Sequence, residues 1–346
     1  MGNSLRVGIV GATGYAGVEL VRLLLGHPEV EIVGLSSVSF AGQEISTLYP
    51  GLRSSLQMEL SDGPEAFLDR CDAVFASLPH GLSQGLAKQC VDAGVVFIDL
   101  GADFRLHNEE EYAAWYNGRF EDPALHREAV YGLCEWYRDE IRGARLIANP
   151  GCYPTSAALA LAPVLAAGLA EPTGIIIDSK SGVTGAGRGL TLGTHFPECN
   201  ESFAAYKAEG HRHRPEIEQT LSALAGKTAR VTFTPHLLPV NRGILSTVYC
   251  QSEADPATVR AAYEEAYKDE PFVTVLAAGE YANIKNVRMT NLCHISLHRD
   301  DHTGTLIVCS AIDNMVKGAA GQAIQNLNLR FGLDETTGLP LVAPAF

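Results

Sequence analysis

The sequence predicts an α/β protein of two domains, an expectation that rests on chain length and on a change of pattern along the chain. At 346 residues the chain is long for one hydrophobic core and comfortable for two. Its first half alternates apolar strand patterns with helical patterns, as is typical of a parallel sheet. Its second half contains a run of strand patterns with a single helix among them, which favours an α+β domain with a mostly antiparallel sheet.

The chain opens on a strand, a glycine turn, a helix and a second strand. Residues 5–10 are the first apolar run, and residues 18–25 have the spacing of a helix. Between them, Gly11, Gly14 and Gly17 bring the backbone close to a pyrophosphate and open a helix whose N–H groups favour an anion. This unit predicts a Rossmann-type dinucleotide-binding domain. The expected cofactor-binding residues of the turn are Gly11, Thr13, Gly14, Tyr15, Ala16 and Gly17.

The end of the second strand, residues 30–35, indicates which dinucleotide is bound. NAD sites place Asp or Glu there to accept a hydrogen bond from the ribose 2′-hydroxyl. Here Ser36, Ser37 and Ser39 follow the strand, and Glu31 lies too early. Hydroxyl groups without a carboxylate tolerate a 2′-phosphate, so NADPH or NADP+ is the expected cofactor.

The alternation continues with strands at 72–78 and 95–100 and a helix at 83–93. In open α/β sheets ligands gather at the carboxyl ends of the strands. Residues 101–105 follow one such end, and Arg105 is therefore a candidate anion-binding cation. The alternative is a surface arginine paired with a carboxylate.

A single cysteine stands in the turn Asn149-Pro150-Gly151-Cys152-Tyr153-Pro154-Thr155, between an apolar segment and an alanine-rich helical pattern at 156–167. The free N–H groups and the dipole of a helix start favour an anion, which lowers the pKa of a thiol. Cys152 is thus the candidate nucleophile.

Further along, a strand at 174–181 leads into the glycine-rich loop 182–189, which lacks the spacing of a P-loop but could offer N–H groups to an oxyanion or phosphate. His211 and His213 then precede a helix that begins near Pro215. A histidine at a helix start is biased towards its neutral form, which accepts protons. The alternative to an acid/base role is that the two histidines lie in a solvated basic segment that caps the helix.

The remaining segments complete the second domain and return to the first. The expected strands are 230–234, 244–251, 272–276, 291–297 and 305–311, with a helix at 256–267. A helix opening at Asp313 and running to residue 329 is expected to rejoin the first domain. The predicted division is 1–151 with 313–346 for the dinucleotide-binding domain, and 152–312 for the catalytic and self-association domain.

Composition excludes several classes of function. The formal charge of −14 and the pI near 5.2 argue against a general nucleic-acid or membrane-surface role. No apolar run approaches the roughly 20 residues of a membrane helix, and we expect no signal peptide. The eight cysteines are scattered without a C-x-x-C pair, so we expect reduced thiols, no metal site and a cytoplasmic location.

These motifs occur in order over nearly the whole chain and resemble those of the N-acetyl-γ-glutamyl-phosphate reductases, relatives of the aspartate-semialdehyde dehydrogenases. The cysteine motif together with His211-Arg212-His213 is fairly specific, whereas the glycine turn alone is not. The resemblance implies NADPH-dependent reduction of N-acetyl-glutamyl 5-phosphate to the 5-semialdehyde, with release of phosphate, in arginine biosynthesis. Cys152 would carry the acyl group as a thioester.

The resemblance also implies roles for other residues. His211 is the first choice for the acid/base and His213 the second. Arg105 would bind the phosphate. The sequence does not give the oligomeric state, although the antiparallel sheet of the second domain offers a self-association face, and we expect a homodimer or homotetramer. Asn149, Ser181 and Gly182 would lie near the substrate, and Asn314 near the nicotinamide amide.

Other readings stay open at this point. The typical family has a basic residue shortly after the second strand, whereas Val38 and Phe40 flank Ser39 here. The acyl phosphate could instead be aspartyl phosphate or a carrier-linked aminoadipyl phosphate. A phosphorylating aldehyde dehydrogenase of the glyceraldehyde-phosphate type shares the chemistry with a different cysteine context, and a non-catalytic dinucleotide sensor is the alternative from another class.

Overall fold

The computed structural model describes residues 4–346, which form two compact units. The first unit contains the described residues up to Pro150 together with Ala319–Leu339, and the second contains Gly151–Gly318 with Pro340–Phe346. The sequence-based division instead assigned Gly151, residues 313–318 and residues 340–346 to the first domain. Asp313 bonds to Met289, and Asn291 to Pro340, which ties both segments to the second unit. The functional assignment of the two domains stays a prediction.

The first unit is built on a parallel six-stranded sheet in the order β2-β1-β3-β4-β6-β5. All of its strand pairs are parallel, which confirms the predicted α/β class. Because β2 and β3 lie on opposite sides of β1, the strand order reverses beside β1, where such sheets bind ligands. The strands are β1 Leu5–Val10, β2 Val30–Ser36, β3 Ala73–Ala76, β4 Val96–Asp99, β5 Val130–Tyr131 and β6 Leu146–Ala148.

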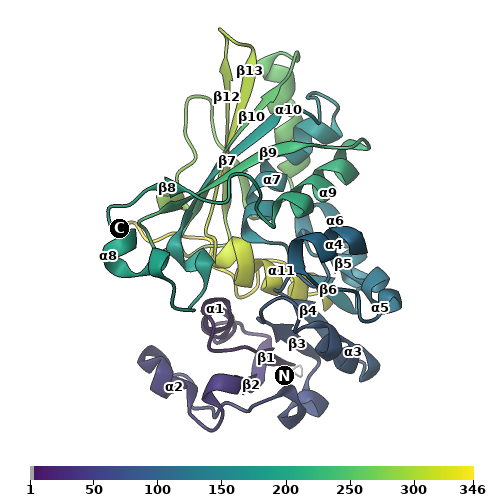
Figure 1. The fold of residues 1–346 in the computed structure, drawn as a ribbon, viewed down its shortest axis with the longest axis vertical. Coiled ribbons are helices and arrows are strands. Elements are labelled where there is room, and N and C mark those ends of the chain that lie inside the picture. The colour runs from purple at the N-terminus through teal and green to yellow at the C-terminus, as the bar shows by residue number, and fades with distance from the viewer. Residues whose placement is uncertain (1–3) are drawn as a thin grey trace. The chain divides into compact units, whose positions relative to one another are not determined.

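Helices cover the first sheet (Figure 1). α1 begins three residues earlier than residue 18, the expected start, because the glycine turn itself supplies the N-cap, Gly14. The C-terminal helix α11 packs on α1 and α6. The helices are α1 Tyr15–Leu24, α2 Ile45–Leu48, α3 Gln84–Asp92, α4 Glu109–Tyr116, α5 Pro123–Glu128, α6 Cys134–Gly143 and α11 Gly321–Arg330.

The second unit contains a seven-stranded sheet in the order β11-β12-β13-β10-β7-β9-β8. Only β7–β9 and β11–β12 pair in parallel, so the expectation of a mostly antiparallel sheet is confirmed. The strands are β7 Ile175–Gly182, β8 Ala204–Ala205, β9 Val231–Leu238, β10 Ile244–Gln251, β11 Val273–Val275, β12 Cys293–Asp300 and β13 Thr305–Ile312.

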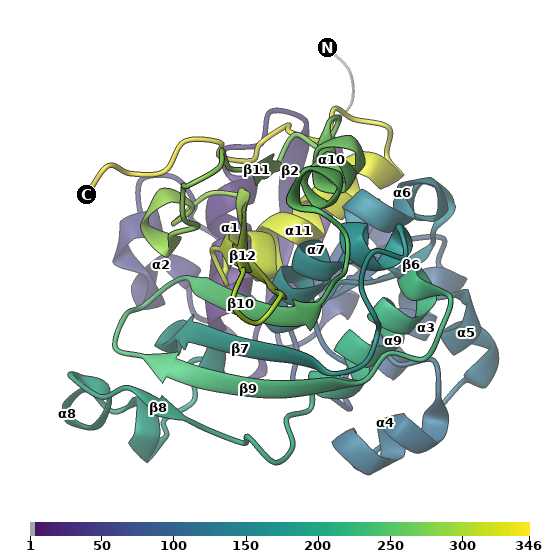
Figure 2. The ribbon, with the colours of Figure 1, turned by 90° about the horizontal axis from the view of Figure 1, so that it is seen from above.

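The longer helices of the second unit pack together against this sheet. α7 contacts β10, β13, α9 and α10, and Figure 2 shows α7 and α10 on the same side of β7 and β10. Along β7 the residues that face the helices are buried, whereas Ile176 on the opposite face is exposed. The helices are α7 Cys152–Ala166, α8 Phe196–Cys199, α9 Arg214–Ala225 and α10 Pro256–Tyr267.

The segment expected to form one helix from Asp313 to 329 is interrupted. A π-helix spans Val316–Ala320, and α11 begins only at Gly321. The Asp313 carboxylate accepts the N–H groups of Met315 and Val316, and the Gly318 N–H bonds to the Asp313 carbonyl. This i to i+5 bond widens the turn, so the expectation of a single helix was wrong for its first part.

Three further findings concern residues 4–346 only. In this part of the chain no helix is long and apolar enough to cross a membrane. Its His, Cys, Asp and Glu side chains include no group of three placed to hold a metal ion. The eight cysteines are all free thiols.

Candidate active site

The three glycines of the first turn, Gly11, Gly14 and Gly17, have different structural roles. Gly11 has a φ of +78°, and a Cβ on it would lie 2.3 Å from the Ser77 carbonyl oxygen at the end of β3. A Cβ on Gly17 would lie 2.2 Å from the Gly11 carbonyl oxygen, so Gly17 allows α1 to pack on the turn. A Cβ on Gly14 would meet its nearest atom only at 3.6 Å, an ordinary contact. The protein itself therefore does not require a glycine at position 14.

The open space beside Gly14, in contrast to Gly11 and Gly17, is consistent with a site for a bound dinucleotide. A ligand whose pyrophosphate approaches the backbone needs the space that a Cβ on residue 14 would fill. Helix α1, which starts at Tyr15, has neither a side-chain cap nor an acidic residue in its first turn, so its positive end is suited to attract a phosphate.

The serines at the end of β2 shape this turn. The carbonyl oxygen of Ser36 accepts the N–H groups of Gly11 and Ala12. The hydroxyl of Ser37 lies 2.7 Å from that of Thr13, and both residues are buried. Ser39 is the exposed member of the three. Ser36 and Ser37 thus support the turn, and Ser39 is the serine most open to a ligand.

Asp103 organises the loops after β3 and β4. This carboxylate is completely buried, and it accepts the N–H groups of Gly81 (2.6 Å) and Ser83 (2.9 Å) and the hydroxyl of Tyr112 (2.8 Å). It therefore ties the turn that follows β3 to the turn that contains Arg105. Burial, with the nearby Asp103 charge, raises the pKa of Asp99 to about 6.

Arg105 is buried, and its guanidinium donates to backbone carbonyls. Nε bonds to the Asn149 oxygen at 2.8 Å and Nη2 to the Leu100 oxygen at 2.7 Å. The Asn149 side chain is itself held by Ala319 and Asn326. This geometry does not match a surface arginine, and it places Arg105 against a residue that precedes Cys152 by three positions.

Cys152 is the first residue of α7, four residues earlier than the expected helix start. The N-cap is Gly151, and the first turn contains neither a side-chain cap nor an acidic residue. Gly151 donates its N–H to Oε1 of Glu216 at 2.8 Å, and Glu216 is completely buried in the first turn of α9. This bond joins the start of the cysteine helix to the start of the helix that follows the histidines.

Both candidate histidines contact the ring of Tyr153, the neighbour of the cysteine. The ring centroids of His211 and His213 lie 5.7 and 5.9 Å from that of Tyr153. The Tyr153 hydroxyl lies 3.0 Å from that of Tyr206. Burial raises the pKa of Tyr153, and the nearby Tyr206 and Cys152 add to the effect, so the thiol lies beside this cluster.

His211 is a neutral imidazole at neutral pH. Burial lowers the pKa of His211 to about 4, and the charges of Lys207 and Arg212 contribute. Its Nδ1 accepts the N–H of His213 at 3.1 Å, which assigns the ring proton to Nε2. The histidines, the cysteine and the tyrosines thus converge, although which histidine acts as acid/base stays a prediction.

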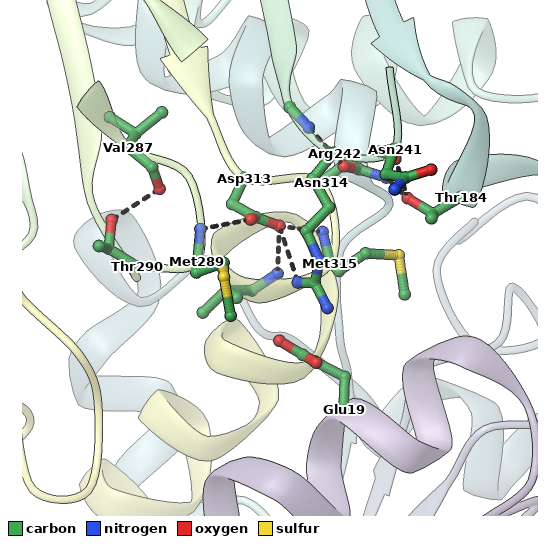
Figure 3. Close-up of polar contacts among 12 residues, drawn as sticks. Glu19, Thr184, Asn241, Arg242, Val287, Met289, Thr290, Asp313, Asn314 and Met315 are labelled. Atoms are coloured by element: carbon green, nitrogen blue, oxygen red, sulfur yellow. Dashed lines mark hydrogen bonds and ion pairs between the residues drawn. The ribbon is translucent and has the colours of Figure 1, made fainter. Parts of the chain in front are cut away.

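The glycine-rich loop after β7 supplies the other expected substrate residues. Ser181 is buried, and its hydroxyl bonds to the Gly182 carbonyl and also lies beside the Tyr153 phenol. A Cβ on Gly182 would lie 2.6 Å from the Asn241 carbonyl oxygen. The Asn314 side chain bonds to Gly243 and Thr184 (Figure 3). Its contact with a nicotinamide stays a prediction.

Sequence reasoning missed three residues of this cluster: Tyr153, Tyr206 and Glu216. Tyr153 lies inside the cysteine motif and could have been proposed from its position. Glu216 was interpreted only as a favourable charge at a helix start. No local pattern shows that it reaches Gly151, because that contact depends on how two helices pack.

Comparison with known proteins identifies two family models along the chain. Residues 6–144 match the semialdehyde dehydrogenase NAD-binding domain, and residues 152–314 match the semialdehyde dehydrogenase dimerisation domain. Proteins named N-acetyl-gamma-glutamyl-phosphate reductase are similar over 99% of this chain. That of Clostridium beijerinckii is 55% identical with 100% of its length covered, and that of Symbiobacterium thermophilum is 54% identical with 99% covered.

Solved structures share the fold at low sequence identity. Aspartate semialdehyde dehydrogenase II of Vibrio cholerae, in complex with ASA, has a TM-score of 0.73 at 17% identity, covering 96% of this chain and 99% of its own. The Candida albicans aspartate semialdehyde dehydrogenase with NADP has a TM-score of 0.68 at 15% identity, and the match covers 94% of this chain and 98% of the Candida chain. At these identities the likeness shows the fold alone.

We predict that His211 makes the protein less stable in acid. A histidine whose pKa is about 4 when folded and near 6.5 when unfolded contributes stability above pH 6.5 that is lost as the pH falls towards 4. Between pH 7 and pH 4.5 the loss should be about 2 kcal/mol. Urea unfolding of the wild type and His211→Asn at pH 4.5 and pH 7 measures it. The variant should lose less stability than the wild type on acidification. Equal losses in the two proteins would contradict the prediction.

Proposed function

The chain belongs to the N-acetyl-γ-glutamyl-phosphate reductase family, and we propose that it reduces N-acetyl-glutamyl 5-phosphate to N-acetyl-glutamate 5-semialdehyde, with release of phosphate, in arginine biosynthesis. Identity of 53–55% over nearly full length with proteins of that name supports this acyl group over aspartyl or carrier-linked aminoadipyl phosphate. The observation that carries the chemistry is the position of the Cys152 thiol at the start of α7, beside Tyr153 and the two histidines.

The first half of the reaction transfers the acyl group to the protein. His211, neutral at neutral pH, accepts the thiol proton of Cys152 at Nδ1 after this atom has released the N–H of His213, and His213 is the second choice for this role. The thiolate then attacks the acyl carbon, the bond from that carbon to the phosphate oxygen breaks, and a thioester forms. Arg105 binds the leaving phosphate. The N–H groups at the start of α7 stabilise the oxyanion that forms on the acyl carbon during the attack.

The second half releases the aldehyde. NADPH, when bound, supplies the hydride that reduces the thioester carbonyl. His211 donates its proton to the carbonyl oxygen as charge develops there. When the carbon–sulfur bond breaks, His211 takes this proton back from the oxygen and passes it to the sulfur, so that the free aldehyde and the thiol are formed. The glycine turn from Gly11 to Gly17 would hold the pyrophosphate, and Ser39 would face the 2′-phosphate.

The substrate assignment is tested with three semialdehydes, those of N-acetylglutamate, aspartate and carrier-linked aminoadipate, each assayed with phosphate and with either NADP or NAD. We expect the highest kcat/KM for N-acetylglutamate semialdehyde with NADP, by at least about 100-fold over the other two substrates. A preference for aspartate semialdehyde would contradict the proposed substrate, and a preference for NAD would contradict the proposed cofactor.

Two glycine variants test the cofactor site. Gly14→Ala adds a methyl group that the chain accommodates, so folding should be retained while affinity for NADPH falls at least about tenfold. Gly17→Ala pushes a methyl into backbone atoms and should cost about 2 kcal/mol or more of stability. Fluorescence titration with NADPH and urea unfolding measure the two quantities. Wild-type affinity in Gly14→Ala would place the pyrophosphate elsewhere.

We also propose that two copies associate through the second unit, in a reduced, cytoplasmic setting consistent with the eight free cysteines. The matched dimerisation-domain model supports this. The face of the seven-stranded sheet opposite α7 presents Ile176, and the segment that follows the glycine-rich loop exposes Leu190, Leu192, Phe196 and Phe203. Exposed apolar side chains of this number are typical of an interface.

Sedimentation equilibrium tests this association. The wild type should sediment at twice the chain mass of 37.0 kDa or at a larger multiple. Ile176→Glu, which places a charge on the uncovered sheet face, should shift the protein towards the monomer, whereas Val38→Glu, on an exposed side chain of the first unit, should not. A monomeric wild type at micromolar concentration would contradict the proposal, and an Ile176→Glu variant that stays fully associated would exclude this face.

A further inference from the structure

Asp313, the residue after β13, is a completely buried acid that the reaction described above does not use. Its Oδ1 accepts the N–H groups of Met315 (2.8 Å) and Val316 (3.1 Å), and its Oδ2 accepts that of Met289 (2.6 Å) (Figure 3). Nη1 of Arg242 lies 3.5 Å from Oδ1. A buried carboxylate is tolerated only when hydrogen bonds and an opposite charge compensate it. Asp313 therefore fixes three segments of the second unit relative to one another.

The backbone at one of these bonds is strained. Met289 has a φ of +63°, a left-handed conformation that costs a residue with a side chain about 1 kcal/mol. Its N–H points at the Asp313 carboxylate in this conformation. The strained residue is thus held in place by the buried acid.

The next residue, Asn314, connects the same turn to the loop after β7. Its Oδ1 accepts the N–H of Gly243 at 2.7 Å, and its Nδ2 donates to Oγ1 of Thr184 at 3.0 Å. The Thr184 hydroxyl and N–H both donate to the carbonyl oxygen of Asn241. Asn314 therefore sets the position of the loop that begins with Ser181 and Gly182, the expected substrate residues.

The π-helix that follows lies directly against the cysteine. A Cβ on Gly318 would be 2.8 Å from the Cβ of Cys152 and 3.3 Å from its Cα, so there is no room for a side chain at position 318. The Gly318 N–H bonds to the Asp313 carbonyl at 2.9 Å. The acid that fixes the turn thus also fixes the surface on which the cysteine rests.

We propose that residues 313–318 form a positioning turn, in which Gly318 sets the place of the Cys152 side chain and Asn314 sets the place of the substrate loop, while Asp313 holds the two in a fixed relation. Gly318 and Asp313 act only through other groups, and Asn314 has this positioning role in addition to its predicted contact with the nicotinamide. The inference deepens the proposed function, since it takes Cys152 as the nucleophile. Displacement of a reacting atom by about 1 Å can reduce a rate by about 100-fold, so a fixed turn has a direct effect on turnover.

The first test is Gly318→Ala, with Gly143→Ala as the matched control because a methyl on Gly143 meets no atom within 4 Å. In Gly318→Ala the added methyl must displace Cys152, so kcat for N-acetylglutamate semialdehyde should fall about 10- to 100-fold while KM stays within about twofold. Gly143→Ala should match the wild type. A kcat for Gly318→Ala within twofold of the wild-type value would overturn the proposal. A fall in kcat no larger than the fall in the fraction of folded protein, measured by urea unfolding, would overturn it as well.

A second variant addresses the loop and remains informative if Gly318→Ala does not fold. Thr184→Val keeps the shape of the side chain and removes the hydroxyl that links Asn314 to Asn241. KM for the semialdehyde should rise about fivefold or more, with kcat within about twofold. An unchanged KM, or a kcat that falls as far as KM rises, would contradict the role of the loop contact.

A readout without turnover separates this proposal from the proposed function. The rate at which iodoacetamide alkylates Cys152, followed by peptide mass spectrometry against pH, reports the position and ionisation of the thiol. In Gly318→Ala the alkylation rate of Cys152 at a given pH should differ from the wild-type rate by threefold or more. In Gly143→Ala the rate should match that of the wild type. If the wild type turns over no semialdehyde, the proposed function fails, but the alkylation profile still tests the positioning turn. Identical profiles in the wild type, Gly318→Ala and Gly143→Ala would overturn the positioning turn.

Discussion

The start of helix α7 is the constraint on which the rest of the structure depends. Every residue from Tyr153 to Leu165 is buried, so the helix is fixed within the core of the second unit and its first residue, Cys152, cannot move independently. Glu216 holds the N-cap N–H, and Gly318 lies against the Cβ of the cysteine. A nucleophile at a helix start gains from N–H groups that need no reorganisation when charge develops. That benefit exists only if the helix start stays in place.

Buried carboxylates provide much of this order in both units. Asp103 joins two loops at the carboxyl ends of parallel strands, Glu216 joins two helix starts, and Asp313 joins three loops. Each accepts backbone N–H groups that would otherwise be unsatisfied at a loop or helix end. The acids thus hold short irregular segments, on which the expected ligand-binding residues lie, through hydrogen bonds to their backbone.

The sequence predicted those parts of the fold that depend on local periodicity. β1, β10 and α10 lie where apolar spacing placed them, and Cys152 stands at a helix start as its motif indicated. Helix α4 was not predicted because it begins with three glutamates and buries only Tyr112 and Tyr116, so the sequence shows no apolar periodicity there. The contacts of Glu216 with Gly151 and of Asp313 with Met289 could not be predicted, because these partners are distant in sequence and are selected by packing. The π-helix was missed although Asp313 bonds locally to Met315, Val316 and Gly318, because no apolar spacing in the sequence marks an i to i+5 turn.

The central claim is that Cys152 carries the acyl group, and it can be tested by trapping the intermediate. The protein is mixed with N-acetylglutamate semialdehyde and NADP without phosphate, quenched in acid and digested for mass spectrometry. We expect an N-acetylglutamyl adduct on the peptide that contains Cys152, its absence in Cys152→Ser, and its loss when phosphate is added before the quench. An adduct on another cysteine, or turnover without any adduct in the wild type and retained in Cys152→Ser, would contradict the account.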